Sequence, residues 1–404
     1  MPLALKATET LLLRVSALAI GLGVNVVISR ALGPEGRGQY TLAVLAALIL
    51  ATLGKLGLEN ANLYLLGTAH VPAARLGAQN LVVSLVAGLP AILLLAVGPT
   101  LLPTIFGDMP VGLLLLAGVT IPFAIHSQLA GGLQNLTGLV TWQFRALLLG
   151  AATQLVIAGV LAGTGRLDVT SALESNIVGT FVSWLLIVYR DGWGTLRLQV
   201  DLGLLTRSLR YSLVVHLALV LLFLQQRLNV FVVKALLDTV AVGQYTLALS
   251  LGEAFLLASD SLAIAMVPQQ TATTIAHAAR LALRVGRMGG LVTGAAVIPG
   301  IVLGSQAISL AFGDAFRPSY APFVVLLPGM IFLAMQRFCG PPVLRANNPM
   351  RMVRIYVVGV VANMLLNLWW IPMWGLGGAA AAATASYAIT VTLFLRWTLE
   401  LARE

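Results

Sequence analysis

Charged side chains inside the longest apolar stretches are the residues of this chain best suited to chemistry. Arg227 and Arg337 lie within such stretches, and Glu253 and Asp260 lie in the stretch that follows Arg227. A charge at bilayer depth costs about 2.5–3.5 kcal/mol on insertion scales, so it is retained where it is paired or functional. These four residues are therefore the first candidates for a site.

A guanidinium in such a position has two possible roles. It can bind a phosphate through two parallel hydrogen bonds, or it can form a structural ion pair with a neighbouring helix. The sequence favours neither role for Arg227 or Arg337. Glu253 and Asp260 are two helical turns apart, which predicts that they share one helix face. Either can pair with Arg227 or bind a coupling proton or sodium ion; we favour pairing for Asp260 and function for Glu253.

Histidine and cysteine residues add little to this set. His126 and His216 each stand alone in an apolar stretch, where a hydrogen-bonded structural role is commoner and a proton relay is the alternative. Lys55 and Glu59 have the i, i+4 spacing of a local ion pair. The single cysteine, Cys339, excludes an intrachain disulfide. No Cys/His spacing is typical of metal binding, and we predict no metal and no cofactor.

Composition identifies the elements that carry these residues as membrane-spanning helices. The chain is 59% hydrophobic and 9% charged, whereas soluble domains contain about 25% charged residues. Leu76–Gly107, Met109–Phe144 and Ile355–Leu395 contain no charged side chain. A spanning helix needs about 20 apolar residues. The sequence therefore predicts an all-α polytopic membrane protein with about twelve spans, near 11–30, 39–58, 76–98, 111–133, 143–163, 171–190, 211–236, 240–266, 286–310, 320–344, 351–373 and 375–397.

The positive charges are distributed unequally between the two sides of these spans. Most of the 24 Lys and Arg residues fall on one side, while a few, including Arg30 and Arg37, fall on the other. The positive-inside rule then predicts cytoplasmic N- and C-termini in the cell (inner) membrane. The net charge of +10 is thus an orientation signal, and we predict no nucleic-acid partner. Arginines between 190 and 210 also suit the headgroups of anionic membrane lipids.

An internal repeat divides the chain in two. The hexapeptide Gly38–Ala43 recurs as Gly243–Ala248, and Phe106-Gly107-Asp108 recurs at nearly the same offset as Phe312-Gly313-Asp314. Six predicted spans separate the copies, so both halves enter the membrane with the same polarity. This predicts two pseudo-symmetric six-helix halves, 1–205 and 206–404, around a central cavity. A fusion that only stiffens the bundle is the alternative.

Four motifs in the same order resemble those of the polysaccharide-export (oligosaccharide) flippases. They are Ile28–Tyr40, the stretch from Arg227 to Glu253, Phe312-Gly313-Asp314 with Leu326-Leu327-Pro328-Gly329, and Asn363 and Asn367 with Gly375–Ala380. The resemblance implies the fold of the multidrug/oligosaccharidyl-lipid/polysaccharide exporter superfamily. It implies flipping of an undecaprenyl-diphosphate-linked oligosaccharide from the cytoplasmic to the outer leaflet. We predict in addition that movement of H⁺ or Na⁺ through Glu253 drives the transport.

The same resemblance assigns roles residue by residue. Arg30 and Arg227 match arginines of the family, so Arg30 joins Arg227 and Arg337 as a candidate cavity cation. Asn229 stands where the family usually has Asp, so the role of that carboxylate is lost or taken by Glu253. The main alternative is a cation-coupled multidrug-type antiporter of the same fold. We predict no enzyme, because no GxxxxGK[ST] loop and no GxSxG elbow occur in the sequence.

Overall fold

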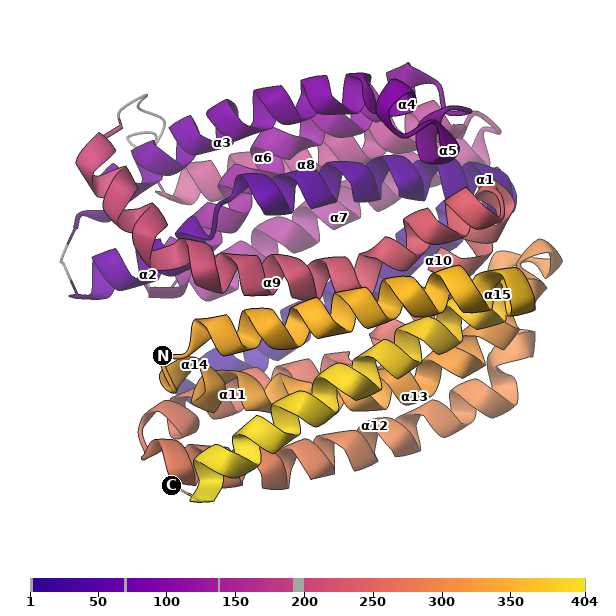
Figure 1. Ribbon diagram of the computed structural model, residues 1–404. Helices are drawn as coiled ribbons and strands as arrows, with labels where there is room; N and C mark the ends of the chain where they lie inside the picture. Colours follow the sequence, from indigo (N-terminus) through magenta and orange to yellow (C-terminus); the bar gives the residue numbers. More distant parts are fainter. Residues whose placement is uncertain (1–2, 69–70, 137–138, 192–199, 404) are drawn as a thin grey trace. The chain divides into compact units, whose positions relative to one another are not determined.

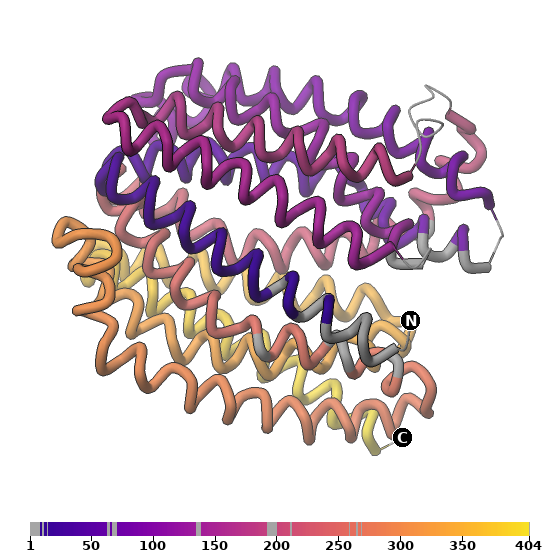
Figure 2. The backbone as a smooth tube through the Cα atoms, turned by 180° about the vertical axis from the view of Figure 1, so that it is seen from behind, coloured from indigo at the N-terminus to yellow at the C-terminus, as the bar shows by residue number. Residues whose placement is uncertain are grey.

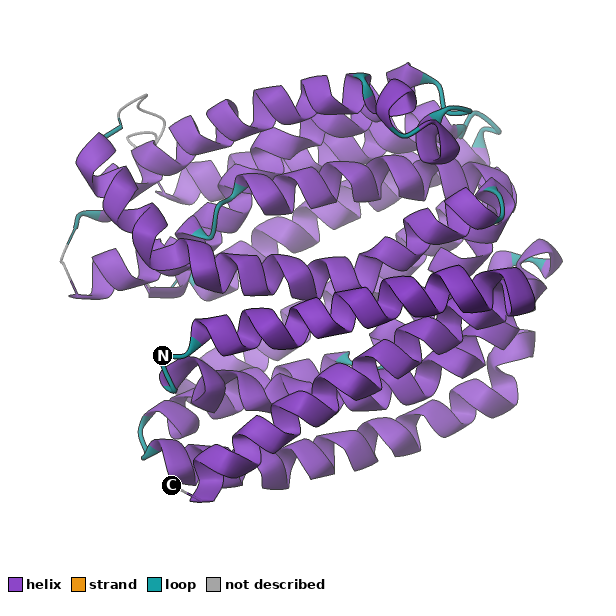
Figure 3. Ribbon diagram, viewed as in Figure 1, coloured by secondary structure: helices purple, strands orange, loops and turns teal. Residues whose placement is uncertain are grey.

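The computed structural model describes residues 3–68, 71–136, 139–191 and 200–403. Every element within these ranges is helical, which confirms the predicted all-α class (Figures 1 and 3). The chain forms two compact units, Met1–His216 and Leu217–Glu404. The units divide after His216, inside helix α9 (Leu202–Leu236), and this division does not test the predicted boundary between residues 205 and 206. That boundary and the central cavity stay predictions.

The first unit begins with one long helix that is broken in the middle. Helix α1 contains Gly33 with a φ of 65°, a backbone conformation that glycine adopts without strain, and Pro34 follows it. This break separates the first two predicted spans. The elements of the unit are α1 (Leu3–Gly54), α2 (Leu58–Thr68), α3 (Ala73–Ala96), α4 (Gly98–Leu101), α5 (Pro103–Phe106), α6 (Val111–Leu136), α7 (Val140–Gly163), α8 (Val169–Asp191) and the start of α9 (Leu202–Leu236).

Small residues allow close packing within this unit. Helix α7 packs against α1 and α8, and α3 packs against α6. A Cβ atom added at Gly150 of α7 would lie 2.4 Å from the carbonyl oxygen of Gly179 in α8, so the two backbones approach as closely as glycine permits. Glycine and serine commonly mediate helix contacts in membranes, where packing rather than hydrophobic burial drives association.

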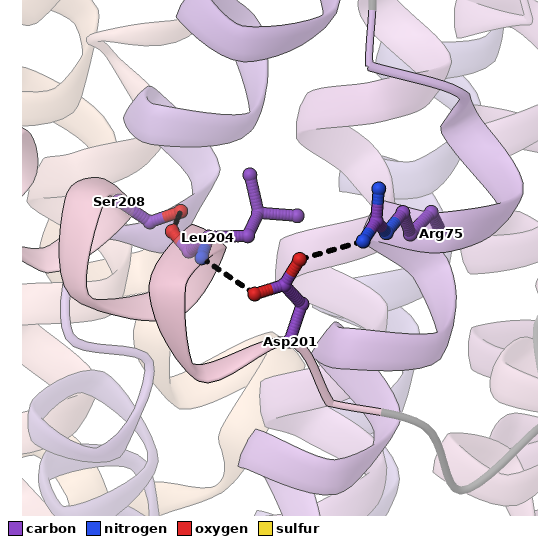
Figure 4. Close-up of polar contacts among 4 residues, drawn as sticks. All are labelled: Arg75, Asp201, Leu204 and Ser208. Atoms are coloured by element: carbon purple, nitrogen blue, oxygen red, sulfur yellow. Dashed lines mark hydrogen bonds and ion pairs between the residues drawn. The ribbon is translucent and has the colours of Figure 1, made fainter.

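An ion pair outside the apolar spans fixes the start of α9 to α3 (Figure 4). Asp201 caps α9, because its Oδ1 accepts the backbone N–H of Leu204 at 3.0 Å, and its Oδ2 lies 2.6 Å from Nη2 of Arg75. The hydrogen bond from Leu204, followed by the charge of Arg75, holds the pKa of Asp201 below its ordinary value. The capping interaction thus favours the ionised carboxylate.

The second unit also contains a long broken helix. Helix α15 has a glycine, Gly375, with a φ of 57°, which separates the last two predicted spans. Helix α13 packs against α10, α12 and α15. The elements are the remainder of α9, α10 (Thr239–Ala254), α11 (Leu257–Thr271), α12 (Ile275–Phe312), η2 (Asp314–Ser319), α13 (Tyr320–Gln336), η3 (Arg337–Cys339), α14 (Gly340–Arg345) and α15 (Pro349–Arg403).

The number of spans depends on how the broken helices are divided. Within the described ranges, 9 helices are long and apolar enough to cross a membrane. Two of them, α1 and α15, contain the glycine breaks, and the predicted span 240–266 is divided between α10 and α11. The multi-pass architecture is therefore confirmed, while the count of about twelve stays a prediction.

The sequence repeat occupies matching positions in the two units. The first copy lies in α1 after its break, and the second lies in α10. In each copy the tyrosine hydroxyl accepts an amide N–H from another helix. Tyr40 accepts from Gln154 at 3.0 Å and Tyr245 accepts from Asn229 at 3.1 Å. The repeat therefore preserves an interhelical hydrogen bond as well as a sequence.

Candidate functional site

Arg227 of α9 and Glu253 of α10 form a two-pronged ion pair. Nη1 of Arg227 lies 2.9 Å from Oε1 of Glu253, and Nη2 donates to Oε2 at 3.0 Å. The two side chains are 25% and 31% exposed. The parallel geometry matches the fork of the guanidinium to both oxygens of the carboxylate. Of the partners that the sequence left open for Arg227, the structure selects Glu253.

Asp260 has a different partner from the one that the sequence suggested. Its Oδ1 lies 2.7 Å from Nε of Arg337, and both side chains are partly exposed. Glu253 and Asp260 do not lie on one uninterrupted helix, and that they share one face stays a prediction. The chain turns after Ala254, with the N–H of Leu256 bonded to the carbonyl of Glu253, and α11 begins at Leu257. The break directs the two carboxylates to two different arginines.

Arg337 follows the end of helix α13 and lies within the candidate membrane span Asp314–Arg345. Helix α13 ends at Gln336, and Arg337 opens the short 3-10 helix η3. Its neighbour Gln336 donates to the hydroxyl of Tyr356 at 2.9 Å. With Asp260, Arg337 forms a second arginine–carboxylate pair in the same unit as Arg227 and Glu253.

Asn229 belongs to a neutral network on another side of α9. Its Nδ2 donates to the hydroxyl of Tyr245 at 3.1 Å and to the carbonyl of Ala379 at 3.4 Å, while its Oδ1 accepts from Asn367 at 3.1 Å. Residues two apart on a helix point in nearly opposite directions. The hydrogen bonds of Asn229 accordingly go to Tyr245 and α15, and not to Glu253.

The network continues along α15 through buried amides and hydroxyls. Asn363 donates to the backbone carbonyl of Gln225 at 3.1 Å and to Ser386 at 3.0 Å. The side chain of Gln225 donates to Thr390 at 2.8 Å. Interhelical amide hydrogen bonds in lipid are worth about 0.6–2 kcal/mol each. This hydrogen-bond network was not predicted from the sequence, although Asn363 and Asn367, four residues apart in an apolar stretch, could have indicated an interhelical polar contact.

The structure separates two arginines that flank the break in α1. Arg30, a predicted cavity cation, is exposed. Arg37, predicted on an outward loop, is instead buried inside α1. It donates to the hydroxyl of Ser29 and to the carbonyl of Asn25 at 3.4 Å, across the break at Gly33. Arg37 thus joins the two arms of α1, a role that charge counting could not reveal.

The two histidines lie in the first unit in different surroundings. His126 of α6 is buried, and its Nδ1 accepts the indole N–H of Trp184 at 3.2 Å. Because an indole only donates, Nε2 carries the proton of a neutral His126. His216 of α9 packs over Gly57 and lies within electrostatic reach of Lys55 and Glu59. Lys55 and Glu59 form the predicted local pair, at 2.8 Å.

Other candidates from the sequence can be located as well. Cys339 is buried and free. Among the described residues, no group of three or more His, Cys, Asp or Glu side chains is arranged to hold a metal ion. Of the arginines between 190 and 210, Arg190, Arg207 and Arg210 are exposed, and Arg197 lies outside the described ranges.

Comparison with known proteins identifies the fold. No protein-family model matches the chain, and no curated protein matches it. Three solved structures illustrate the similarity. A multidrug resistance MATE family transporter of the MOP superfamily, in an inward-facing conformation, shares 16% identity over 98% of both chains with a TM-score of 0.72. The lipid II flippase MurJ, in an inward closed conformation, shares 12% identity over 97% of this chain and 90% of its own, with a TM-score of 0.76.

The third structure, the MATE transporter VcmN of Vibrio cholerae, shares 12% identity over 98% of this chain and 95% of its own, with a TM-score of 0.68. Identities this low establish the fold and not the substrate. The chain therefore has the all-helical fold of MATE transporters and of the flippase MurJ, with two pseudo-symmetric halves.

Proposed function

We propose that this protein is a membrane transporter that flips a lipid-linked oligosaccharide, carried on undecaprenyl diphosphate, from the cytoplasmic to the outer leaflet by alternating access. The observation that carries the proposal is the partly exposed pair of Arg227 and Glu253. The fold supports transport in general, because the solved structures that share it are described as transporters and a flippase. The choice of substrate rests on the chemistry of the ion pair.

A diphosphate can replace the carboxylate of Glu253 on Arg227. Phosphate and carboxylate oxygens offer the guanidinium the same two-pronged geometry. A diphosphate carries more negative charge than a carboxylate, so the exchange strengthens the attraction at the guanidinium. The part of Arg227 that remains exposed gives an incoming anion access without prior unfolding of the helices.

The exchange also suggests how a cation is coupled to transport. Once displaced, Glu253 is a carboxylate without its arginine. Protonation or a bound cation then neutralises this negative charge and removes the free-energy cost of keeping it unpaired in a low-dielectric environment. An unpaired arginine cannot be neutralised by losing its proton, because a guanidinium is not deprotonated in proteins. Binding an anion at Arg227 with cation uptake at Glu253 therefore leaves neither Arg227 nor Glu253 with an unpaired charge.

This asymmetry favours the flippase over a multidrug-type antiporter. A cationic substrate would have to displace Arg227 from Glu253 and leave a permanent guanidinium unpaired. Among the described residues, the other carboxylate of this region, Asp260, is likewise paired with an arginine, Arg337. The likeness to MATE transporters keeps the antiporter as the second candidate. We place the protein in the cell (inner) membrane, with both termini cytoplasmic, from the distribution of basic residues.

Binding measurements on purified protein in nanodiscs distinguish the two candidates. Three variants are compared: Arg227→Gln, Glu253→Gln and the control Arg317→Gln, which changes an exposed arginine of the same unit. The ligands are a polyprenyl diphosphate and a cationic dye. Loss of charge-assisted hydrogen bonds costs about 1.5–3 kcal/mol, so Arg227→Gln should weaken diphosphate binding about 10- to 100-fold.

The Glu253→Gln variant should not weaken diphosphate binding, in contrast to Arg227→Gln. It should bind the diphosphate at least as tightly as the wild type, and with a weaker dependence on pH, because no carboxylate competes for Arg227. The control should bind like the wild type. Retained diphosphate binding in Arg227→Gln would refute the proposal. Dye binding that is lost in Glu253→Gln, with no diphosphate binding in any variant, would establish the antiporter instead.

A further inference from the structure

Three arginines lie on one face of α12 near its start. Arg280, Arg284 and Arg287 are spaced i, i+4 and i+7, and all three are exposed. Residues with this spacing lie above one another along a helix. Helix α12 runs along the edge of the second unit in both views (Figures 1 and 2). We call these three residues the arginine ladder.

The same face of α12 continues as an apolar stripe. Leu291 is 74% exposed and Leu310 is 80% exposed, and the exposed residues between them are apolar, among them Val292, Ile298 and Val302, with Gln306 as the exception. At 1.5 Å per residue, the helix from Met288 to Leu310 is about 33 Å long, which matches the hydrocarbon core of a bilayer. If the stripe spans the hydrocarbon, the ladder lies at the depth of the lipid headgroups.

Three acidic residues of the second unit form ion pairs with arginines outside the ladder. Glu253 pairs with Arg227, Asp260 with Arg337, and Glu400 with Arg351 at 2.6 Å. Within the described ranges, no ion pair to a carboxylate is formed by the ladder.

One ladder residue has a backbone partner. Nε of Arg280 donates to the carbonyl of Ala402 at 3.1 Å, which holds this side chain beside the end of α15. Among the described residues, the ladder is therefore a concentrated positive surface that no carboxylate pairs with.

We propose that the arginine ladder binds the phosphate groups of anionic phospholipids, whose acyl chains lie along the apolar stripe of α12. Exposed arginines at headgroup depth attract anionic lipid and can bind phosphate through two hydrogen bonds. The bias of basic residues to one side explains the sign of these charges. It does not explain why they align on one face above a stripe of membrane length, whereas a bound lipid needs both features together.

The proposed lipid site is independent of the transported substrate. It uses α12 alone, while the proposed transport chemistry uses Arg227 and Glu253. Its consequence is that anionic lipid stabilises the second unit and fixes the depth of α12 in the bilayer. Soluble phosphate should not substitute, because it cannot occupy the apolar stripe.

Titration of the purified full chain with phosphatidylglycerol tests this proposal. Bound lipid is counted by native mass spectrometry, and phosphatidylcholine serves as the neutral comparison. The variant Arg284→Gln/Arg287→Gln should bind phosphatidylglycerol about tenfold more weakly than the wild type. The variant Arg284→Lys/Arg287→Lys, which keeps the charge, should stay within about threefold of the wild type.

A matched control removes the same charge from the same unit. Arg354→Gln/Arg396→Gln changes two exposed arginines of α15 that lie on opposite sides of its break, and it should bind like the wild type. Equal weakening in this control would show a general charge effect and overturn the proposal. Unchanged binding in Arg284→Gln/Arg287→Gln would overturn it as well, and so would competition by glycerol phosphate at the same concentration.

Discussion

Substitution of Gly359 by alanine should strongly destabilise the second unit. A Cβ atom at this position would lie 2.3 Å from Oγ1 of Thr390, 2.7 Å from Nε2 of Gln225 and 2.8 Å from its Cδ. These distances are too short for any atom pair, so both side chains must move. Movement breaks the 2.8 Å hydrogen bond between them. Overpacking costs about 1–3 kcal/mol and a buried unsatisfied amide about 1–3 kcal/mol more, so we expect a loss of about 3–5 kcal/mol.

A second substitution on the partner tests the origin of this loss. Thr390→Ala removes the hydroxyl that meets the new methyl group. The double variant Gly359→Ala/Thr390→Ala should therefore cost about 1–2 kcal/mol less than the sum of the two single variants. Gly377→Ala is the matched control, because nothing lies within 4 Å of its Cβ position on the same helix. It should change stability by less than about 1 kcal/mol.

Equilibrium unfolding in mixed micelles of dodecylmaltoside and dodecylsulfate, followed by tryptophan fluorescence, gives these free energies. If Gly359→Ala unfolds within about 0.5 kcal/mol of the wild type, the close contact of α9 with α15 at this point does not exist. If the two single losses simply add, the clash lies elsewhere than at Thr390. Either result would refute the account of the polar network as a tightly packed core.

Three further predictions concern the first unit. Gly150→Ala should cost at least about 3 kcal/mol of unfolding free energy because its Cβ meets a backbone carbonyl of α8, whereas Gly159→Ala, with open space around it, should be near neutral in the same unfolding assay. The pKa of Asp201 is lowered in the folded state, so the stability advantage of the wild type over Asp201→Asn should be full above about pH 4 and decline as the pH falls further; a thermal-unfolding difference that is equal at pH 7 and pH 3 would contradict this. Arg37→Met should lose about 1–3 kcal/mol, since two acceptors of the first arm of α1 lose their donor; wild-type stability in that variant would show that Arg37 does not hold the break.

The class of protein was predictable because lipid imposes simple rules on composition. With 9% charged residues, the chain cannot cover itself with polar surface, and in hydrocarbon only helices or closed barrels satisfy the backbone. The breaks in α1 and α15 lie at Gly33 and Gly375, because glycine tolerates the positive φ that each break requires. The repeat around Tyr40 and Tyr245 identified the two halves. Long apolar helices, their breaks and their duplication can thus be recognised from the sequence alone.

The partners of the charged residues were not predictable in the same way. The spacing of Glu253 and Asp260 suggested one face, yet the turn after α10 sends them to Arg227 and Arg337. Such a turn depends on packing. Residues 255 and 256 are neither proline nor glycine, so the sequence does not predict a turn there. A shift of one residue in the position of the break would rotate every later side chain by about 100°.

The sequence by itself determined that this is a helical, duplicated membrane protein with arginines and carboxylates inside its spans. Only the tertiary structure decided that Arg37 is buried, that Asn229 joins an amide network with α15, and that each of the partly exposed carboxylates Glu253 and Asp260 has its own arginine. The physical reason is that hydropathy is a sum over neighbours in sequence, whereas an ion pair or hydrogen bond requires a particular rotation of two helices that are distant in sequence.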